Sequence, residues 1–167
     1  MTMMNDATAA AIAVLTTRER TIQRLLTRQA ERFGPRPLLS VAGVHRCHAD
    51  AVGAAAGRGG ALRAADVTHG DRVALMGTNR IETLDVFLGC GWIGAASVPS
   101  NTAAMGPQIG YYLANSGARL LVIEDRFVDR LAYAELAQTQ LETIWVVGET
   151  GGCPEAIGGV RCVPYPA

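Results

Sequence analysis

Residues 89–94 (GCGWIG) match the G-x-G-x-x-G spacing with which backbone amides can hold the pyrophosphate of a dinucleotide. That chemistry needs a strand before the glycines and a helix after them, so that the helix N-terminus faces the phosphates. Here the glycines close a predicted helix and precede a predicted strand, so their amides point the wrong way. We therefore interpret them as small residues that allow close packing between helix and sheet.

Two further groups of residues include some, but not all, of the residue types that a metal site or a phosphate loop needs. His45, Cys47 and His48 lie within four residues, yet no fourth ligand lies nearby in the sequence. We interpret them as ordinary surface and boundary residues. Residues 57–60 (GRGG) lack the Lys and the Ser/Thr of a phosphate loop, and they interrupt a predicted helix instead of starting one.

Arg126 and Arg130 are spaced to share one face of a predicted helix, just beyond the carboxyl end of a predicted strand. In open α/β sheets that edge is where ligands bind, so the two guanidinium groups could contact an anion. The alternative is that both are solvated surface arginines. No Ser/His/Asp arrangement, paired carboxylates or zinc signature accompanies them.

Composition excludes several classes of function. All fifteen basic residues are Arg and none is Lys, which rules out any mechanism in this chain that needs an ammonium group. The formal net charge is zero, so we expect no nucleic-acid partner. No apolar run is long enough to span a membrane, and the first basic residue follows the Ala-rich opening, unlike a signal peptide. We expect a cytoplasmic protein whose four cysteines are reduced.

The elements that would position these residues alternate between strands and helices. The predicted strands are continuous apolar runs, as in a parallel sheet buried on both faces. We therefore predict an α/β fold with a mainly parallel sheet and helices on both faces. The core strands are residues 72–76, 95–98, 120–123 and 143–147, and the intervening helices are 81–93, with Asn79 as N-cap, 106–115 and 126–138. Before them we predict a helix at 20–33, strands at 38–41 and 44–47, and a helix at 49–65.

This pattern divides the chain into three parts. Residues 1–19 are predicted to be a flexible N-terminal tail, and residues 20–147 form the α/β region. Residues 148–167 are rich in Gly and Pro and are predicted to be loop or linker, with one possible strand at 160–163.

Several short motifs in the α/β region, in order and spacing, resemble the N-terminal part of AMP-forming acyl-CoA synthetases, members of the adenylate-forming superfamily. They are residues 70–75 (GDRVAL), Asn79, residues 87–95 (FLGCGWIGA), Val98-Pro99 and Asn101. The flanks at 21–37 and 112–123 (YLANSGARLLVI) are similar to the same family. Residues 101–106 (NTAAMG) resemble the branch that contains crotonobetaine/carnitine–CoA ligases.

The resemblance implies a fold like the first part of the large N-terminal domain of these enzymes. It also implies their activity: ATP and a carboxylic acid give an acyl-adenylate, and CoA then gives the thioester. ATP, Mg²⁺ and CoA are the cofactors of the full-length family. The family's phosphate loop with its Lys and its magnesium-binding Glu motif are not found in this sequence, so we expect no catalytic residue, no metal ligand and no tightly bound cofactor here. By the same resemblance, Asn101, Arg126 and Arg130 are candidates for contact with the CoA nucleotide.

Three readings follow. The first is an N-terminal fragment or truncated product of such a ligase, inactive alone. The second is a free-standing, non-catalytic α/β module that binds a nucleotide or a protein, and the third is one piece of a split ligase. In the family a second sheet covers helices of this region, so the first reading predicts an exposed apolar face and self-association.

Overall fold

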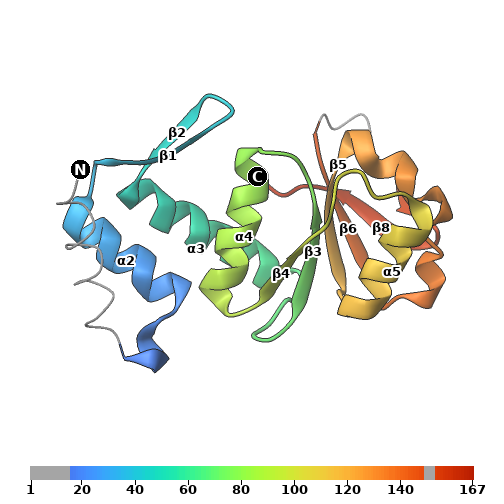
Figure 1. Ribbon diagram of the computed structural model, residues 1–167, viewed down its shortest axis with the longest axis horizontal. Helices are drawn as coiled ribbons and strands as arrows, with labels where there is room; N and C mark the ends of the chain where they lie inside the picture. Colours follow the sequence, from blue (N-terminus) through green and yellow to red (C-terminus); the bar gives the residue numbers. More distant parts are fainter. Residues whose placement is uncertain (1–15, 149–152) are drawn as a thin grey trace.

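The computed structural model describes residues 16–148 and 153–167 of the chain, and its centre is a six-stranded sheet (Figure 1). The strand order is β4-β3-β5-β6-β8-β7, and every pair is parallel except β7 with β8. The strands are β3 Arg72–Met76, β4 Ala96–Pro99, β5 Leu120–Glu124, β6 Thr143–Val147, β7 Ala156–Ile157 and β8 Val160–Pro164. The mainly parallel sheet predicted from the apolar runs is confirmed.

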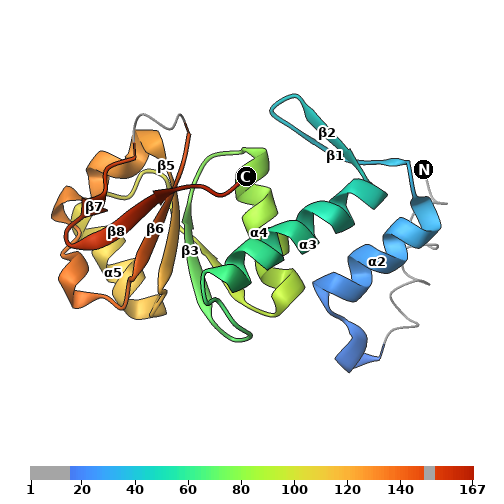
Figure 2. The same ribbon diagram turned by 180° about the vertical axis from the view of Figure 1, so that it is seen from behind.

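Helices cover both faces of this sheet (Figures 1 and 2). One face packs against α3 (His48–Ala64) and α4 (Ile81–Ile93), and the other packs against α5 (Gly106–Ser116) and η2 (Asp125–Tyr133). Alternate residues of each central strand enter opposite cores: Leu121 and Ile123 face α5, whereas Leu120 and Val122 face α4. The middle residues of each central strand are therefore apolar, because both faces of the strand are buried there.

An outer layer lies beyond α3 and α4, away from the sheet (Figure 2). It consists of the short 3-10 helix η1 (Thr17–Glu19), the helix α2 (Ile22–Phe33) and an antiparallel hairpin of β1 (Pro37–Val41) and β2 (Val44–Cys47). Helix α2 packs against α3 and α4, yet none of its residues is buried.

Glycines allow α3 and α4 to pack closely. A Cβ at Gly89 would lie 2.7 Å from Arg58 Cγ, and one at Gly59 would lie 2.9 Å from Ile93 Cγ2. Both sites are in the two sequence motifs that resemble phosphate-binding loops, and both are buried. These glycines therefore serve packing, as predicted for residues 89–94, but the packing is between helices α3 and α4 and not between helix and sheet.

Arg58 also contacts Tyr165 and Pro166, near the C-terminal end of the chain, and holds them against α3. Its guanidinium lies 3.9 Å above the Tyr165 ring centroid, and its Nη1 donates a 2.8 Å hydrogen bond to the Pro166 carbonyl. The Tyr165 hydroxyl donates to the Glu82 carbonyl of α4, and the Tyr165 ring meets Trp145 edge-on. The segment after β8 thus crosses from the sheet to α3 and α4.

Three predictions about local structure are wrong. Residues 126–138 form no α-helix; they form two 3-10 segments, η2 and η3 (Leu136–Gln138), separated by Glu135 with a φ of 46°. Asn79 is not the N-cap of α4; that position is Arg80, which makes no side-chain cap. Residues 153–167 are not simply a linker, because β7 and β8 extend the sheet beyond β6, although the strand predicted at 160–163 is confirmed. The predicted tail lies outside the described residues except for 16–19.

Candidate functional site

The carboxyl ends of β3 and β5 are neighbours in the sheet although β4 lies between them in the sequence. The connection through α4 runs to one side of β3 and the connection through α5 returns to the other, so the strand order reverses between β3 and β5. In open α/β sheets, ligands bind at the carboxyl ends of the strands where the order reverses in this way. The residues that follow β3, β4 and β5 therefore form the candidate site.

A buried carboxylate closes the crevice between the two strands. Glu124, at the end of β5, has only 3% of its side chain exposed. Its Oε1 accepts hydrogen bonds of 2.5 Å from both the backbone N–H and the hydroxyl of Thr78, which follows β3. Its Oε2 lies 3.0 Å from Nε of Arg126. The charge is thus hydrogen-bonded and paired, as a buried carboxylate needs.

Arg126 and Arg130 both lie against one aromatic ring, that of Phe127. Their guanidinium carbons lie 4.7 and 4.5 Å from the Phe127 ring centroid. Arg130 Nη1 also donates to the backbone carbonyl of Thr102, in the loop that follows β4. The two arginines therefore contact the same ring, but the helix that carries them is a 3-10 helix and not the predicted α-helix. The Arg126 side chain remains 59% exposed.

Asn101 is exposed and precedes Thr102 in the same loop. Its Oδ1 accepts a 2.8 Å hydrogen bond from the Ala103 backbone N–H, which closes a tight local turn. Because the oxygen is used in the turn, the side-chain NH₂ is the group that could meet a ligand oxygen. The hydrogen bond from Arg130 to Thr102 thus brings all three residues predicted for nucleotide contact to one edge of the sheet.

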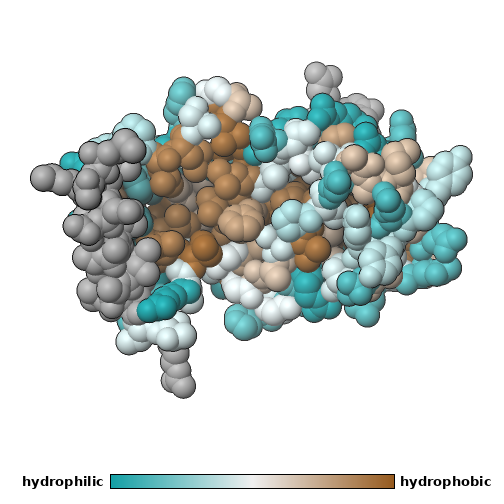
Figure 3. Space-filling model, viewed as in Figure 1, coloured by the Kyte–Doolittle hydropathy of each residue, from teal (hydrophilic) through white to brown (hydrophobic). Residues whose placement is uncertain are grey.

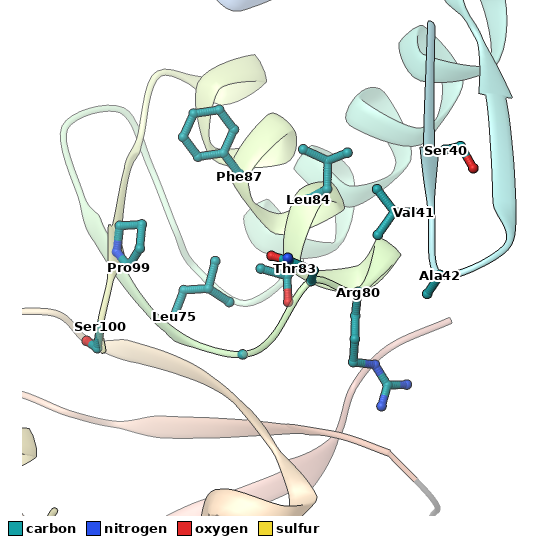
Figure 4. A pocket seen from close by; sticks show the side chains of 12 residues that line it. Ser40, Val41, Ala42, Leu75, Arg80, Thr83, Leu84, Phe87, Pro99 and Ser100 are labelled. Carbon is teal, nitrogen blue, oxygen red and sulfur yellow. The ribbon is translucent and has the colours of Figure 1, made fainter. Parts of the chain in front are cut away.

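A cleft of about 470 Å³ lies on the α4 side of this edge, between α4 and the β1–β2 hairpin (Figure 4). Leu75, Leu84 and Phe87 line it with apolar atoms, and the Arg80 guanidinium lies at its border. Arg80 is paired with Glu82 through hydrogen bonds of 3.2 and 3.1 Å. Phe87 is 46% exposed, so the cleft opens onto an apolar surface, which Figure 3 shows as a brown area over α4 and the base of the hairpin.

Two of the three residues considered for metal binding, Cys47 and His48, have other roles. The Sγ of Cys47 accepts from the Asp50 N–H and caps the N-terminus of α3. The His48 ring packs 5.0 Å from the Phe33 ring. Within residues 16–148 and 153–167, no group of three His, Cys, Asp or Glu side chains could hold a metal ion. Among the helices of the same residues, none is long and apolar enough to cross a bilayer.

The sequence did not single out Glu124 or the cleft. Glu124 ends the apolar run of β5, and this position at a strand's carboxyl end was a usable signal. The partnership with Thr78 depends on β3 and β5 being adjacent, which follows only from the strand order. The cleft depends on how the hairpin lies over α4, which no local pattern encodes.

Comparison with known proteins gives the family. The sequence profile of the AMP-binding enzyme family matches residues 26–156. A fatty acid–[acyl-carrier-protein] ligase of Streptomyces coeruleorubidus is 34% identical over 90 residues, which are 54% of this chain and 17% of that protein. A feruloyl-CoA synthase of an Amycolatopsis species is 44% identical over 61 residues, which are 36% of this chain and 12% of that protein.

Among solved structures, a long-chain-fatty-acid–CoA ligase from Archaeoglobus fulgidus superposes with a TM-score of 0.71 at 18% identity. The superposition covers 83% of this chain and 29% of that one, and at this identity it shows the fold alone. The chain spans less than a fifth of the length of the two curated relatives above. With the family profile matched over more than half of its length, the chain belongs to the AMP-binding enzyme family and corresponds to the N-terminal portion of these enzymes.

Proposed function

We propose that this chain is the N-terminal part of an ATP-dependent, AMP-forming carboxylic acid–CoA ligase, and that its own residues supply part of the surface on which CoA docks. The names of its relatives support the reaction class, since they join fatty or aromatic acids to CoA or to a carrier protein. The observation that carries the docking surface is the convergence of Arg126 and Arg130 on Phe127, beside the loop of Asn101.

The chemistry of these groups fits the nucleotide end of CoA. Its phosphates are anions, and a guanidinium binds a phosphate through two parallel N–H donors. Phe127 holds both guanidinium groups by cation–π contact, which limits their freedom before a ligand arrives. Asn101 adds a neutral donor on the adjoining loop. The ion pair with Glu124 keeps the Arg126 side chain oriented, but it also offsets part of the positive charge of Arg126.

The binding test uses titration calorimetry with CoA and with its analogue lacking the 3′-phosphate. We expect weak binding to the isolated chain, and at least a tenfold loss in the Arg126→Gln/Arg130→Gln double variant, since a hydrogen bond to a charged group contributes about 1.5–3 kcal/mol. Arg63→Gln/Arg161→Gln, which removes two exposed arginines elsewhere and the same net charge, is the matched control. Equal CoA binding by the wild type and the double variant would show that CoA does not use these arginines.

We further propose that the isolated chain performs no adenylation and binds neither ATP nor Mg²⁺ tightly. Charge that develops on pyrophosphate must be stabilised by cations and oriented donors, and each such contact is worth about a hundredfold or more in rate. The sequence has no Lys and no phosphate-loop motif. We expect no acid-dependent ATP–pyrophosphate exchange with a panel of short, medium and aromatic acids; exchange that survives repurification would overturn this expectation.

Four narrower proposals belong to the same reading. The acid substrate is a fatty or other carboxylic acid, and the protein acts in the cytoplasm. Assignment to the crotonobetaine/carnitine–CoA ligase branch rests on residues 101–106 alone. The apolar cleft beside Phe87 leads us to propose that the isolated chain self-associates, which light scattering after gel filtration would detect.

A further inference from the structure

A second surface groove lies between α5 and the segment that follows η2, which contact each other on one side of the sheet (Figures 1 and 2). Positions 107, 110, 111 and 114 line one wall, and this spacing places them on a single face of α5. Ala134, Glu135 and Gln138 line the other wall. The volume is about 290 Å³, at the lower limit for small-molecule sites, so only a small group fits.

Small residues leave this groove open. Gly110 has no side chain, and a Cβ there would lie 3.0 Å from the Ala134 carbonyl carbon, so α5 lies directly on the backbone of residue 134. Ala114 and Ala134 add only methyl groups. The larger side chains of the groove, Tyr111 and Glu135, therefore border a space that no neighbouring side chain fills.

Glu135 gives the groove its formal charge. Residues 101–118, which include α5, contain no charged residue, and residues 131–141 contain Glu135 alone. Within residues 16–148 and 153–167, none of the ion pairs involves Glu135, and its side chain is exposed. Its left-handed φ of 46° turns the chain between η2 and η3, and non-glycine residues held in this conformation cluster at binding sites. The carboxylate is therefore available to a cation from solution.

Tyr111 supplies an aromatic ring on the α5 wall. The ring is 65% exposed and meets the partly buried Tyr112 ring edge-on at 6.1 Å, which restricts its orientation. The face of an aromatic ring attracts cations, and the amide oxygen of Gln138 adds a neutral acceptor. A carboxylate, an aromatic face and an amide, with no cationic side chain among them, form a set that suits an ammonium group. An anion would be repelled by Glu135, and a neutral ligand would gain nothing from its charge.

We propose that the groove between α5 and η3 binds a small organic ammonium group, with the Tyr111 ring against the cation and Glu135 as its counter-ion. The proposal goes beyond the ligase assignment and does not depend on it, because the groove contains none of the three residues proposed to contact CoA. Contact with an exposed ring and pairing with an exposed carboxylate each strengthen binding about two- to fivefold. We therefore expect a dissociation constant in the millimolar range.

The test is saturation-transfer NMR on the purified 167-residue chain, which suits weak binding. One probe is choline, and the second is its neutral isostere, in which a carbon atom replaces the ammonium nitrogen. We expect transfer to the choline methyl groups and little transfer to the isostere. A capped Gly-Lys-Gly peptide is the third probe: tighter binding of choline assigns the ammonium to a free small molecule, and tighter binding of the peptide assigns it to a lysine side chain of another protein.

The decisive comparison uses two double variants with the same changes of residue type. Tyr111→Leu/Glu135→Gln should weaken choline binding about tenfold, whereas Tyr133→Leu/Glu155→Gln, at two exposed positions that do not line the groove, should change it less than about twofold. All four side chains are exposed, and circular dichroism checks that both variants remain folded. Equal losses in the two variants, equal binding of the neutral isostere, or no transfer to either ammonium probe would each overturn the proposal.

Discussion

Gly110, in the middle of α5, tests the packing of α5 against the 3-10 segments, because two physical effects there have opposite signs. Ala is favoured over Gly inside a helix by about 1 kcal/mol, so helix propensity alone predicts that Gly110→Ala stabilises the protein. In the structure, however, a Cβ at position 110 would lie 3.0 Å from the Ala134 carbonyl carbon and closer still to its oxygen. The obstacle is backbone, which cannot rotate away as a side chain can.

The magnitudes decide the sign. Forcing an extra methyl group into a packed contact costs about 1–3 kcal/mol, and a backbone obstacle places the cost near the upper limit. After the gain in propensity, Gly110→Ala should be destabilised by about 2 kcal/mol. Gly57, an exposed residue in α3 with no atom within 4 Å of an added Cβ, is the matched control and should gain up to about 1 kcal/mol as Ala.

Urea unfolding followed by circular dichroism measures both changes, provided that the slope m is the same in all three proteins. At roughly 2–4 °C per kcal/mol, the two variants should also differ in Tm by about 6–12 °C. If Gly110→Ala proves as stable as the wild type or more stable, α5 does not lie on the backbone of residue 134, and the structure of this face is wrong.

Two further predictions concern the α3–α4 side. Asp85→Ala should destabilise the protein by about 2 kcal/mol, because it leaves Arg46 without its partner. Arg46 donates two hydrogen bonds to Asp85, and the side chains of Arg46 and Asp85 are only 18% and 12% exposed. In urea unfolding, the double variant Arg46→Met/Asp85→Leu should recover most of this loss, and a double variant no more stable than Asp85→Ala would contradict the prediction. Burial raises the pKa of the Cys90 thiol to about 12, so Cys90 should resist a thiol reagent at pH 8 until the protein unfolds, and labelling as fast as that of partly exposed Cys47 would refute its burial.

Local sequence predicted α4 and the central strands well because each has clear end signals. Helix α4 ends at Gly94, whose left-handed conformation stops the helix, and the predicted bounds of α4, β3 and β6 are the observed ones. The strand β8 was predicted, but β7 and its pairing with β8 were missed. Gly158-Gly159 between apolar residues is a turn signal for this hairpin, and both glycines have positive φ.

The 3-10 conformation of residues 125–138 could not be predicted in the same way. Phe127, Val128 and Leu131 are buried, and their spacing suits an α-helix as well as a 3-10 helix. What distinguishes the two conformations is the surface of α5 against which these residues pack. Gly106 and Gly110 let α5 approach the backbone of residues 133 and 134 directly. Such a contact between segments more than twenty residues apart leaves no periodic pattern in either of them.

The candidate site shows the same division between local and long-range information. Arg126 and Arg130 could be singled out because they follow a strand, but Glu124 and Thr78 acquire their contact only when the chain passes through β4 and returns beside β3. Local sequence therefore identifies the two arginines of the site. Glu124, the carboxylate that orients Arg126, can be identified only once the order of the strands is known.

The two proposed sites share the layer formed by α5 and the 3-10 segments, but they select opposite charges. Arg126 and Arg130 on η2 attract an anion, whereas Glu135 and the Tyr111 ring attract a cation. A general effect of charge would therefore change the two kinds of binding in opposite directions. If both proposals hold, substitutions at Arg126 and Arg130 weaken CoA binding and leave choline binding unchanged or slightly tighter, and Glu135→Gln does the reverse. If either change weakens both kinds of binding equally, disruption of the shared layer and not the loss of these charges explains the result.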